Sequence, residues 1–227
     1  GYVNRVAVIT GDTTFSSPWE LCDGSTTGTG SLSQIDLPIT WDDTTVDYTV
    51  TDFGGSSSTI STDPSNSSNN VLMTDKTVGA QTWAGTTLST PSGLSNPIPF
   101  ASGATTMTAH VYSAAAGITV RLKAEDHTDP TRSVETEAVT TTANGWNSLV
   151  FDFANQAPGT AQIDFTYTYD MLSIFYDFGN VPASSTVFYL DSVELIIGGA
   201  ITGCTDPAAL NYDELKDRTS SLSLKIW

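Results

Sequence analysis

Alternation of apolar and polar residues is the clearest pattern along this chain. In residues 119–126, apolar and charged positions alternate one by one, in the order Thr-Val-Arg-Leu-Lys-Ala-Glu-Asp. The same period of two recurs at Leu149, Phe151 and Phe153. Because successive side chains of a strand point to opposite faces, a period of two is typical of a half-buried β-strand. Both segments are therefore predicted to be strands with one buried face.

Short runs of β-branched and aromatic residues, separated by turn-forming residues, fill most of the chain. They predict ten strands, at residues 47–53, 58–61, 71–76, 106–113, 119–126, 134–141, 147–153, 162–169, 172–178 and 187–197. None of these segments has the 3.6-residue period of an amphipathic helix. Ten strands without intervening helices favour an all-β fold over residues 35–198, an antiparallel two-sheet β-sandwich of the jelly-roll type.

The segments that flank this domain differ from it in composition. Residues 1–34 become rich in Gly, Ser and Thr, and such sequence connects elements more often than it packs. We therefore expect an N-terminal arm or linker there. Residues 199–227 are expected to be a short C-terminal tail, whose last apolar residues alternate with Ser and Lys. A terminal strand of that kind can pair with the sheet edge of a neighbouring copy.

The chain has two cysteines, Cys22 and Cys204, near opposite ends. They either form a disulfide in an oxidising compartment or remain two thiols.

Charge narrows the choice of partners. The chain has 8 Lys and Arg against 25 Asp and Glu, a formal net charge of −17. Nucleic acids and anionic membrane surfaces both attract clustered basic residues, so neither is an expected partner. No apolar run approaches the roughly 20 residues that span a bilayer, and no membrane insertion is expected. With 10% aromatic residues, the composition is typical of an extracellular all-β protein, secreted or on a cell or virion surface.

Familiar catalytic motifs are missing from the sequence. It contains neither a Gly-x-Ser-x-Gly elbow nor a His-Glu-x-x-His pair. Glu135 and Glu137, two residues apart on one strand face, are the nearest approach to a pair of catalytic carboxylates. The two histidines, His110 and His127, lack a partner motif, and a lone histidine is more often a structural hydrogen-bonding residue than a base. We therefore expect no enzymatic activity.

A charged hairpin supplies the first candidate binding residues. With its loop centred on Asp129-Pro130, Lys123 falls opposite Glu135 and Arg121 opposite Glu137, with all four side chains on one face. Opposite charges at such positions stabilise an antiparallel pair of strands. The face is either a solvated outer surface or a polar platform whose charged groups reach the hydroxyls of a sugar.

Exposed aromatic rings are the second kind of candidate, since they form platforms for the apolar faces of pyranose rings. Trp83 lies among small and polar residues, and His110 and Tyr112 share one face of a predicted strand. Core packing is the alternative for each of them. Trp146 is expected to be structural. Core positions are predicted for Phe151, Phe153, Phe165, Tyr167, Ile174 and Phe178.

Three carboxylates are candidate ligands for Ca²⁺, which takes six to eight oxygen ligands. Asp42 and Asp43 precede the first predicted strand of the sandwich, and Asp191 lies within an apolar strand near the end of the domain. An inward-pointing Asp there requires a partner. Since the first and last strands of a jelly roll are neighbours, the three carboxylates either converge on a metal ion or bond to a loop.

Several landmarks of the domain resemble those of jelly-roll carbohydrate-binding modules. They are Leu-Pro-Ile-Thr-Trp-Asp-Asp at residues 37–43, Asn-Gly-Trp at residues 144–146 leading into residues 149–153, and Tyr-Leu-Asp-Ser-Val-Glu-Leu at residues 189–195. The resemblance implies that sugars bind at exposed loops or on the concave sheet. It also implies a structural calcium ion shared by the acidic first strand and the closing Asp191, although many members have a second Asp where this chain has Ser192.

The tail carries a second resemblance. Residues 203–213, Gly-Cys-Thr-Asp-Pro-Ala-Ala-Leu-Asn-Tyr-Asp, are similar to a short cysteine motif in secreted proteins of marine bacteria and structural proteins of marine phages. That motif usually continues to a second cysteine in Asp-Gly-Ser-Cys, which this chain lacks. Cys204 thus lacks its usual partner.

The sequence leads to one hypothesis and one alternative. The hypothesis is a non-catalytic, extracellular carbohydrate-binding module. Residues 36–194 have four basic against eighteen acidic residues, which favours a neutral polysaccharide over an acidic one unless calcium bridges the charges. The alternative is a structural or adhesive subunit, a virion decoration or fibre protein or part of a surface filament, that contacts other protein chains through the two flanking segments.

Overall fold

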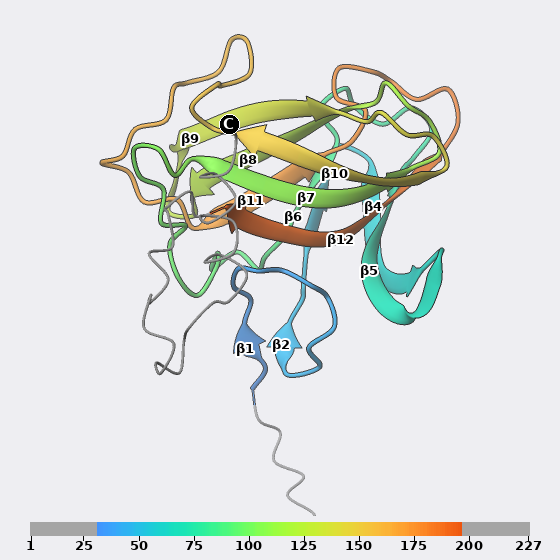
Figure 1. The fold of residues 1–227 in the computed structure, drawn as a ribbon, viewed down its shortest axis with the longest axis horizontal. Coiled ribbons are helices and arrows are strands. Elements are labelled where there is room, and N and C mark those ends of the chain that lie inside the picture. Colours follow the sequence, from blue (N-terminus) through green and yellow to red (C-terminus); the bar gives the residue numbers. More distant parts are fainter. Residues whose placement is uncertain (1–30, 197–227) are drawn as a thin grey trace, which may run out of the picture. The chain divides into compact units, whose positions relative to one another are not determined.

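The computed structural model describes residues 31–196 of the chain (Figure 1). The fold described below belongs to the unit that begins at Ser33. Cys22, Cys204 and nearly all of the predicted arm and tail lie outside the described residues. The boundaries proposed for these segments therefore stay predictions.

Twelve strands and no helix occur in residues 31–196, so no described helix is available to cross a membrane. The strands are β1 Ser33–Gln34, β2 Val46–Asp47, β3 Thr51–Phe53, β4 Ser56–Asp63, β5 Asn66–Lys76, β6 Gly85–Thr87, β7 Thr106–Ser113, β8 Thr119–Asp126, β9 Asp129–Val139, β10 Gly145–Asp152, β11 Met171–Phe175 and β12 Thr186–Ile196.

Ten of these strands form two five-stranded sheets. Sheet 1 has the order β10-β7-β12-β5-β4, and sheet 2 has the order β3-β6-β11-β8-β9. All neighbouring strands within the two sheets are antiparallel, and Figure 1 shows β10, β7 and β12 side by side. From β3 onward, only the β4–β5 and β8–β9 connections stay within one sheet. The predicted jelly-roll β-sandwich is thus confirmed.

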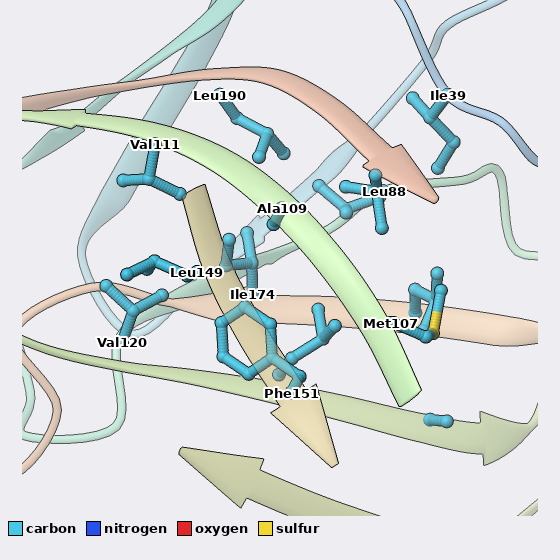
Figure 2. Packing of buried hydrophobic residues seen from close by; sticks show 14 of the residues in the cluster. Ile39, Leu88, Met107, Ala109, Val111, Val120, Leu149, Phe151, Ile174 and Leu190 are labelled. Carbon is cyan, nitrogen blue, oxygen red and sulfur yellow. The ribbon is translucent and has the colours of Figure 1, made fainter. Parts of the chain in front are cut away.

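The core lies between the two sheets and follows the alternation seen in the sequence. Met107, Ala109 and Val111 of β7 are buried, as are Val120 of β8 and Ile174 of β11 on the opposite sheet. Figure 2 shows these side chains meeting in one cluster. The period of two therefore predicts β7 and β8 correctly, including their bounds.

One predicted strand, residues 162–169, is wrong. This segment lies in the long connection between β10 and β11, where Oδ1 of Asp164 accepts hydrogen bonds from the N–H and hydroxyl of Thr166 and forms a turn. The predicted burial of Phe165 and Tyr167 is wrong as well, since they are 49% and 40% exposed. Phe165 and Tyr167 have the spacing of two that is typical of a strand, but the hydrogen bonds of the Asp164 turn determine the local backbone.

Aspartates form a recurring turn throughout the domain. In each case Oδ1 accepts both the N–H and the hydroxyl of a Thr or Ser two residues later, at Asp43, Asp63, Asp126, Asp129 and Asp164. The bonds from threonine lower the pKa of four of these carboxyls below the ordinary value of 3.8, at Asp43, Asp126, Asp129 and Asp164.

These lowered pKa values predict a loss of stability in acid. A carboxyl whose pKa is lower in the folded than in the unfolded state contributes stability above its unfolded pKa and loses that contribution as the pH falls. We expect the urea midpoint to stay nearly constant from pH 7 to pH 5 and to fall below about pH 4. In Asp164→Asn, whose amide oxygen accepts the same bonds without titrating, the fall should be smaller. A midpoint that rises in acid would contradict this role of the turns.

Adjacent residues of β10 test the alternation itself. Phe151 is fully buried in the core, whereas Val150 is 55% exposed on the opposite face of the strand. Phe151→Ala is expected to lower the free energy of unfolding by about 3–5 kcal/mol, through lost burial and a cavity. Val150→Ala should change it by less than about 0.5 kcal/mol. Urea unfolding measures both, and similar losses in the two variants would contradict the assigned faces.

Candidate functional site

A depression of about 450 Å³ lies on the outer face of sheet 2. We call it the groove. Its lining comes from all five strands of the sheet and from nearby loops, and consists of Phe53, Trp83, Thr87, Arg121, Lys123, Glu125, Glu135, Ser173, Phe175 and Phe178. Four of the residues predicted from the sequence, Trp83, Arg121, Lys123 and Glu135, are thus brought together, and Glu137 adjoins them through its ion pair with Arg121.

Aromatic rings form a continuous row in the groove. The ring of Trp83 stacks on Phe53 at 6.2 Å between centroids, with 18° between the ring planes. Phe53 meets Phe175 at 5.4 Å, and Phe175 meets Phe178 at 5.8 Å, both edge to face. Trp83 is 50% exposed. This aromatic row therefore offers solvent an indole face that its neighbours hold in position.

Gly85 permits the close approach of two of these rings. It is paired with Phe53 in the sheet, and a Cβ atom there would lie 2.8 Å from Cζ of Phe53 and 2.9 Å from Cδ1 of Phe175. The same atom would lie 2.7 Å from the carbonyl oxygen of Ile174, which is backbone and cannot rotate away. A side chain on Gly85 would therefore separate Phe53 from Phe175.

A row of polar residues, which we call the polar row, runs beside the aromatic row, two residues further along each strand. Ser173 pairs with Thr87 on one side and with Lys123 on the other, and Lys123 pairs with Glu135. The hydroxyl oxygens of Thr87 and Ser173 are 2.8 Å apart. Nζ of Lys123 donates to Glu125 at 2.6 Å. The groove therefore places hydroxyl, ammonium and carboxylate groups beside the rings.

Arg121 holds one end of both rows in place. Its guanidinium carbon lies 3.5 Å from the centre of the Phe178 ring. Its Nε donates to Glu137 at 2.8 Å and its Nη1 to Glu135 at 2.7 Å. The side chain is 11% exposed. A planar guanidinium can bond to carboxylates along its edge and stack on a ring with its face. Arg121 therefore holds Glu135, Glu137 and Phe178 in position, and little of its own side chain is accessible to a ligand.

The predicted pairing of the charged hairpin is confirmed, but its loop is not where the sequence suggested. Arg121 pairs with Glu137 and Lys123 with Glu135. The chain reverses at residues 127–128, and the register shifts at Asp126, which pairs with Asp129. Two aspartate turns in succession, at Asp126 and Asp129, account for this bulge. Lys123 bonds along its own strand to Glu125 rather than across to Glu135.

His110 and Tyr112 lie on the other sheet. Both are on β7 of sheet 1, on the face opposite its buried residues. The His110 ring stacks on Trp146 at 4.7 Å, and Tyr112 contacts Trp146 and Tyr189, each at 5.7 Å. The structure therefore does not bring His110 and Tyr112 together with the groove. Alternation along one strand shows that two residues share a face but not which residues of other strands join them.

The expectation that Asp191 points into the core is wrong. Asp191 and Ser192 together face His110, because the register between β12 and β7 shifts between Leu190 and Val193. Asp191 follows the buried Leu190 and so faces outward, and the bulge returns Val193 to the core although it lies only two residues further on. The Asp191 carboxylate lies 3.3 Å from Nδ1 of His110 and accepts a bond from Asn69 at 2.9 Å.

Asp42, Asp43 and Asp191 do not form a preformed metal site. Asp42 accepts a bond from the N–H of Asn70 at 3.0 Å, and Asp43 forms its own turn. Within residues 31–196, one group has three potential ligand atoms all within 4.8 Å of one another, namely Asp126, His127 and Asp170. Hydrogen bonds within the protein account for that group. The calcium site stays a prediction that the carboxylate geometry does not support.

The sequence pattern does not single out Phe53, Phe175, Thr87 or Ser173, and it predicts a core position for Phe178. Ile174, Phe175 and Tyr176 are three consecutive large apolar residues, so their pattern cannot show that Phe175 alone faces the groove. A usable signal was Gly85 in the short strand opposite Phe53, since a glycine in a strand often marks a close approach of other groups.

Gly85→Ala tests this packing. The added methyl group is expected to lower the free energy of unfolding by about 1–3 kcal/mol, because the carbonyl of Ile174 and both rings oppose it. Thr87→Ser is the matched control on the same strand, since it keeps the hydroxyl that faces Ser173, and it should have a much smaller effect. Urea unfolding compares the two, and equal stability of Gly85→Ala and the unmodified protein would refute the close packing.

Comparisons with known proteins find no matching family model and no matching curated protein. Among solved structures, the chain is similar to the family 11 carbohydrate-binding module of a cellulosomal cellulase of Clostridium thermocellum, at 16% identity and a TM-score of 0.46, covering 73% of this chain and 95% of that chain. It is similar to the CBM22-1 xylan-binding domain of Paenibacillus barcinonensis Xyn10C, at 14% identity and a TM-score of 0.44, covering 73% and 96%.

An exo-β-agarase has a similar part, at 8% identity and a TM-score of 0.48, covering 72% of this chain and 25% of that chain. None of these likenesses places the chain in a family, and the function has to be inferred from the groove.

Proposed function

We propose that this domain is a non-catalytic carbohydrate-binding module that holds a neutral polysaccharide in the groove of sheet 2. The observation that carries the proposal is the aromatic row, led by the half-exposed Trp83, with a polar row directly beside it. A sugar ring has apolar faces and a rim of hydroxyls. The two rows match these two parts.

The extent of the aromatic row favours several linked sugar rings over a monosaccharide. Within the sheet, the row runs from Phe53 on β3, which stacks on Trp83, to the ring of Phe178, which lies against Arg121 of β8. These strands are three positions apart in sheet 2, a separation of roughly 14 Å at ordinary strand spacing. A polysaccharide lying across the strands would run from Trp83 and Phe53 toward Phe178, above Phe175, which is only 8% exposed.

Electrostatics favours a neutral ligand. Arg121 and Lys123 stand against Glu125, Glu135 and Glu137, so the groove has a small negative net charge. Residues 36–194 as a whole carry four basic and eighteen acidic residues. That field repels uronate and sulfated polysaccharides. Carboxylates accept hydrogen bonds from hydroxyls and Lys123 donates them, so a glucan, mannan or xylan fits the groups present.

The bonds of Glu135 and Glu137 support a binding role rather than glycoside hydrolysis. A glycosidase pairs a protonated acid with an ionised partner. Here one guanidinium donates hydrogen bonds to both carboxylates. Both are thereby tied to one side chain, whereas the two carboxyls of a glycosidase flank the bond that they cleave.

We also propose that the module acts outside the cell, where polysaccharides of this kind are found. Structural calcium, and contacts with other subunits through the flanking segments, remain separate proposals.

Trp83→Ala tests the proposed function. The purified chain is run through gels that contain mixed-linkage β-1,3-1,4-glucan, xylan, galactomannan or alginate, each with calcium and with chelator. We expect retardation by at least one neutral glycan, and a rise in Kd of about tenfold or more in Trp83→Ala, because a stacked sugar ring loses its platform. Trp146→Ala, a tryptophan on the opposite sheet, is the matched control and should keep the affinity. Thermal unfolding of both variants checks their fold.

Full mobility in every gel would contradict the proposal. A chain that is not retarded and that assembles on a sizing column would instead favour the structural subunit. Release of reducing sugar that depends on Glu135 or Glu137 would show an enzyme.

A further inference from the structure

We propose that Lys76, a buried residue of sheet 1, positions Phe178 at one end of the groove and thereby adds affinity for long glycans. The inference rests on the proposed function but concerns a residue that does not line the groove. Lys76 is the last residue of β5 and is fully buried. Phe178 follows β11, a strand of the opposite sheet. Lys76 would therefore act on the groove from the interior of the sandwich.

The backbone reverses its alternation between Tyr176 and Phe178. Tyr176 is fully buried, and its ring stacks on the core residue Phe188 at 4.8 Å, with 4° between the ring planes. Phe178, two residues later, lies against Arg121 in the groove. Side chains two residues apart on a regular strand share one face. The residue between them, Asp177, has a φ of 48°, in the left-handed region, and this conformation produces the reversal.

The ammonium of Lys76 bonds to both carbonyls of this corner. Nζ donates to the carbonyl oxygen of Tyr176 at 3.0 Å and to that of Asp177 at 2.8 Å. One carbonyl precedes the Cα atom of Asp177 and the other follows it, so a donor shared between them fixes the backbone conformation of that residue. Residues other than glycine seldom adopt that conformation. Burial lowers the pKa of Lys76, and the nearby Asp177 carboxylate opposes that shift.

Main-chain hydrogen bonds hold the same segment from its outer side. The N–H of Phe178 donates to the carbonyl of Thr119 at 3.0 Å, and the N–H of Gly179 donates to the carbonyl of Thr82 at 2.9 Å. Lys76 holds the segment from its inner side. Without the ammonium, the corner loses its inner contacts, and the left-handed residue can relax toward an extended conformation. We expect that relaxation to turn the Phe178 ring away from the groove.

The position of Phe178 matters most for long ligands. Its ring lies at the end of the aromatic row that is distant from Trp83. A short oligosaccharide stacked on Trp83 would not reach that end, whereas a long one would contact both. Displacement of Phe178 should therefore weaken the binding of long glycans and leave the binding of short ones unchanged. A general loss of stability would not distinguish ligands by their length.

Lys76→Met tests the inference, because methionine fills the space and donates no hydrogen bond. The Phe178 ring current shifts the Nε–H signal of Arg121, and in ¹⁵N-labelled Lys76→Met this signal should move toward that of an unstacked arginine. The Kd for a hexasaccharide of mixed-linkage glucan or xylan, whichever the unmodified chain binds, should rise about three- to tenfold. The Kd for the disaccharide should stay constant. Phe178→Ala should give the same losses, and the double variant should bind no worse than Phe178→Ala.

Asp177 provides a second pair of variants that keep the buried lysine, should Lys76→Met fail to fold. Asp177→Val should reproduce both effects, because a β-branched residue does not tolerate the left-handed conformation. Asp177→Gly, which adopts it readily, should keep the signal and the affinity. Phe151→Ala, on β10 and three positions from β5 in sheet 1, is the control for stability alone. It should unfold more easily without changing the Arg121 signal or either Kd.

The outcomes separate this inference from the proposed function. An Arg121 signal or a hexasaccharide affinity that is unchanged in both Lys76→Met and Asp177→Val refutes the role of Lys76 and leaves the groove standing. Equal losses for the disaccharide and the hexasaccharide refute it as well, since they indicate general damage. An unmodified chain that binds neither glycan overturns the proposed function and, with it, the effect on long glycans.

Discussion

The guanidinium of Arg121 is the interaction on which both the groove and the sheet beneath it depend. It joins β8 to β9 through Glu135 and Glu137, and it joins β8 to the segment after β11 through the ring of Phe178. Its neighbour Val120 points the opposite way, into the core. A shift of one residue would carry Arg121 inside and Val120 out. The ionic contacts of the outer face and the apolar contacts of the core thus specify the same register.

Many of the acidic residues of this chain have a structural role, which is to close turns. Five aspartates close turns by accepting two hydrogen bonds from the residue two positions later. Local bonding of this kind stabilises an ionised carboxylate without a basic partner. The domain can therefore keep a strongly negative surface, with few lysines and arginines, and still fold its loops. A surface of that sign repels anions.

The features that the sequence predicts correctly are those that depend on residues close together in the chain. The alternation in β7 and β8, the cross-strand pairs of the hairpin and the exposure of Trp83 all depend on short-range rules, and the structure agrees with each. The errors arise where a turn or a bulge interrupts the alternation. The turn at Asp164 exposes Phe165, and the bulge between Leu190 and Val193 puts Asp191 and Val193 on opposite faces despite their spacing of two. The sequence does not predict the aromatic row, because its rings come from segments that are distant in sequence. No single segment contains a pattern that shows these rings to be neighbours.

The topology of sheet 1 has a consequence for how the chain folds. β12, the last strand of the part of the chain that the structure describes, lies in the middle of the sheet and separates β10 and β7 from β5 and β4. Until residues 186–196 emerge from the ribosome, the two halves of this sheet have no strand to join them. Folding must therefore wait for almost the whole domain to be synthesised, and it depends on pairing between distant parts of the sequence, which forms slowly.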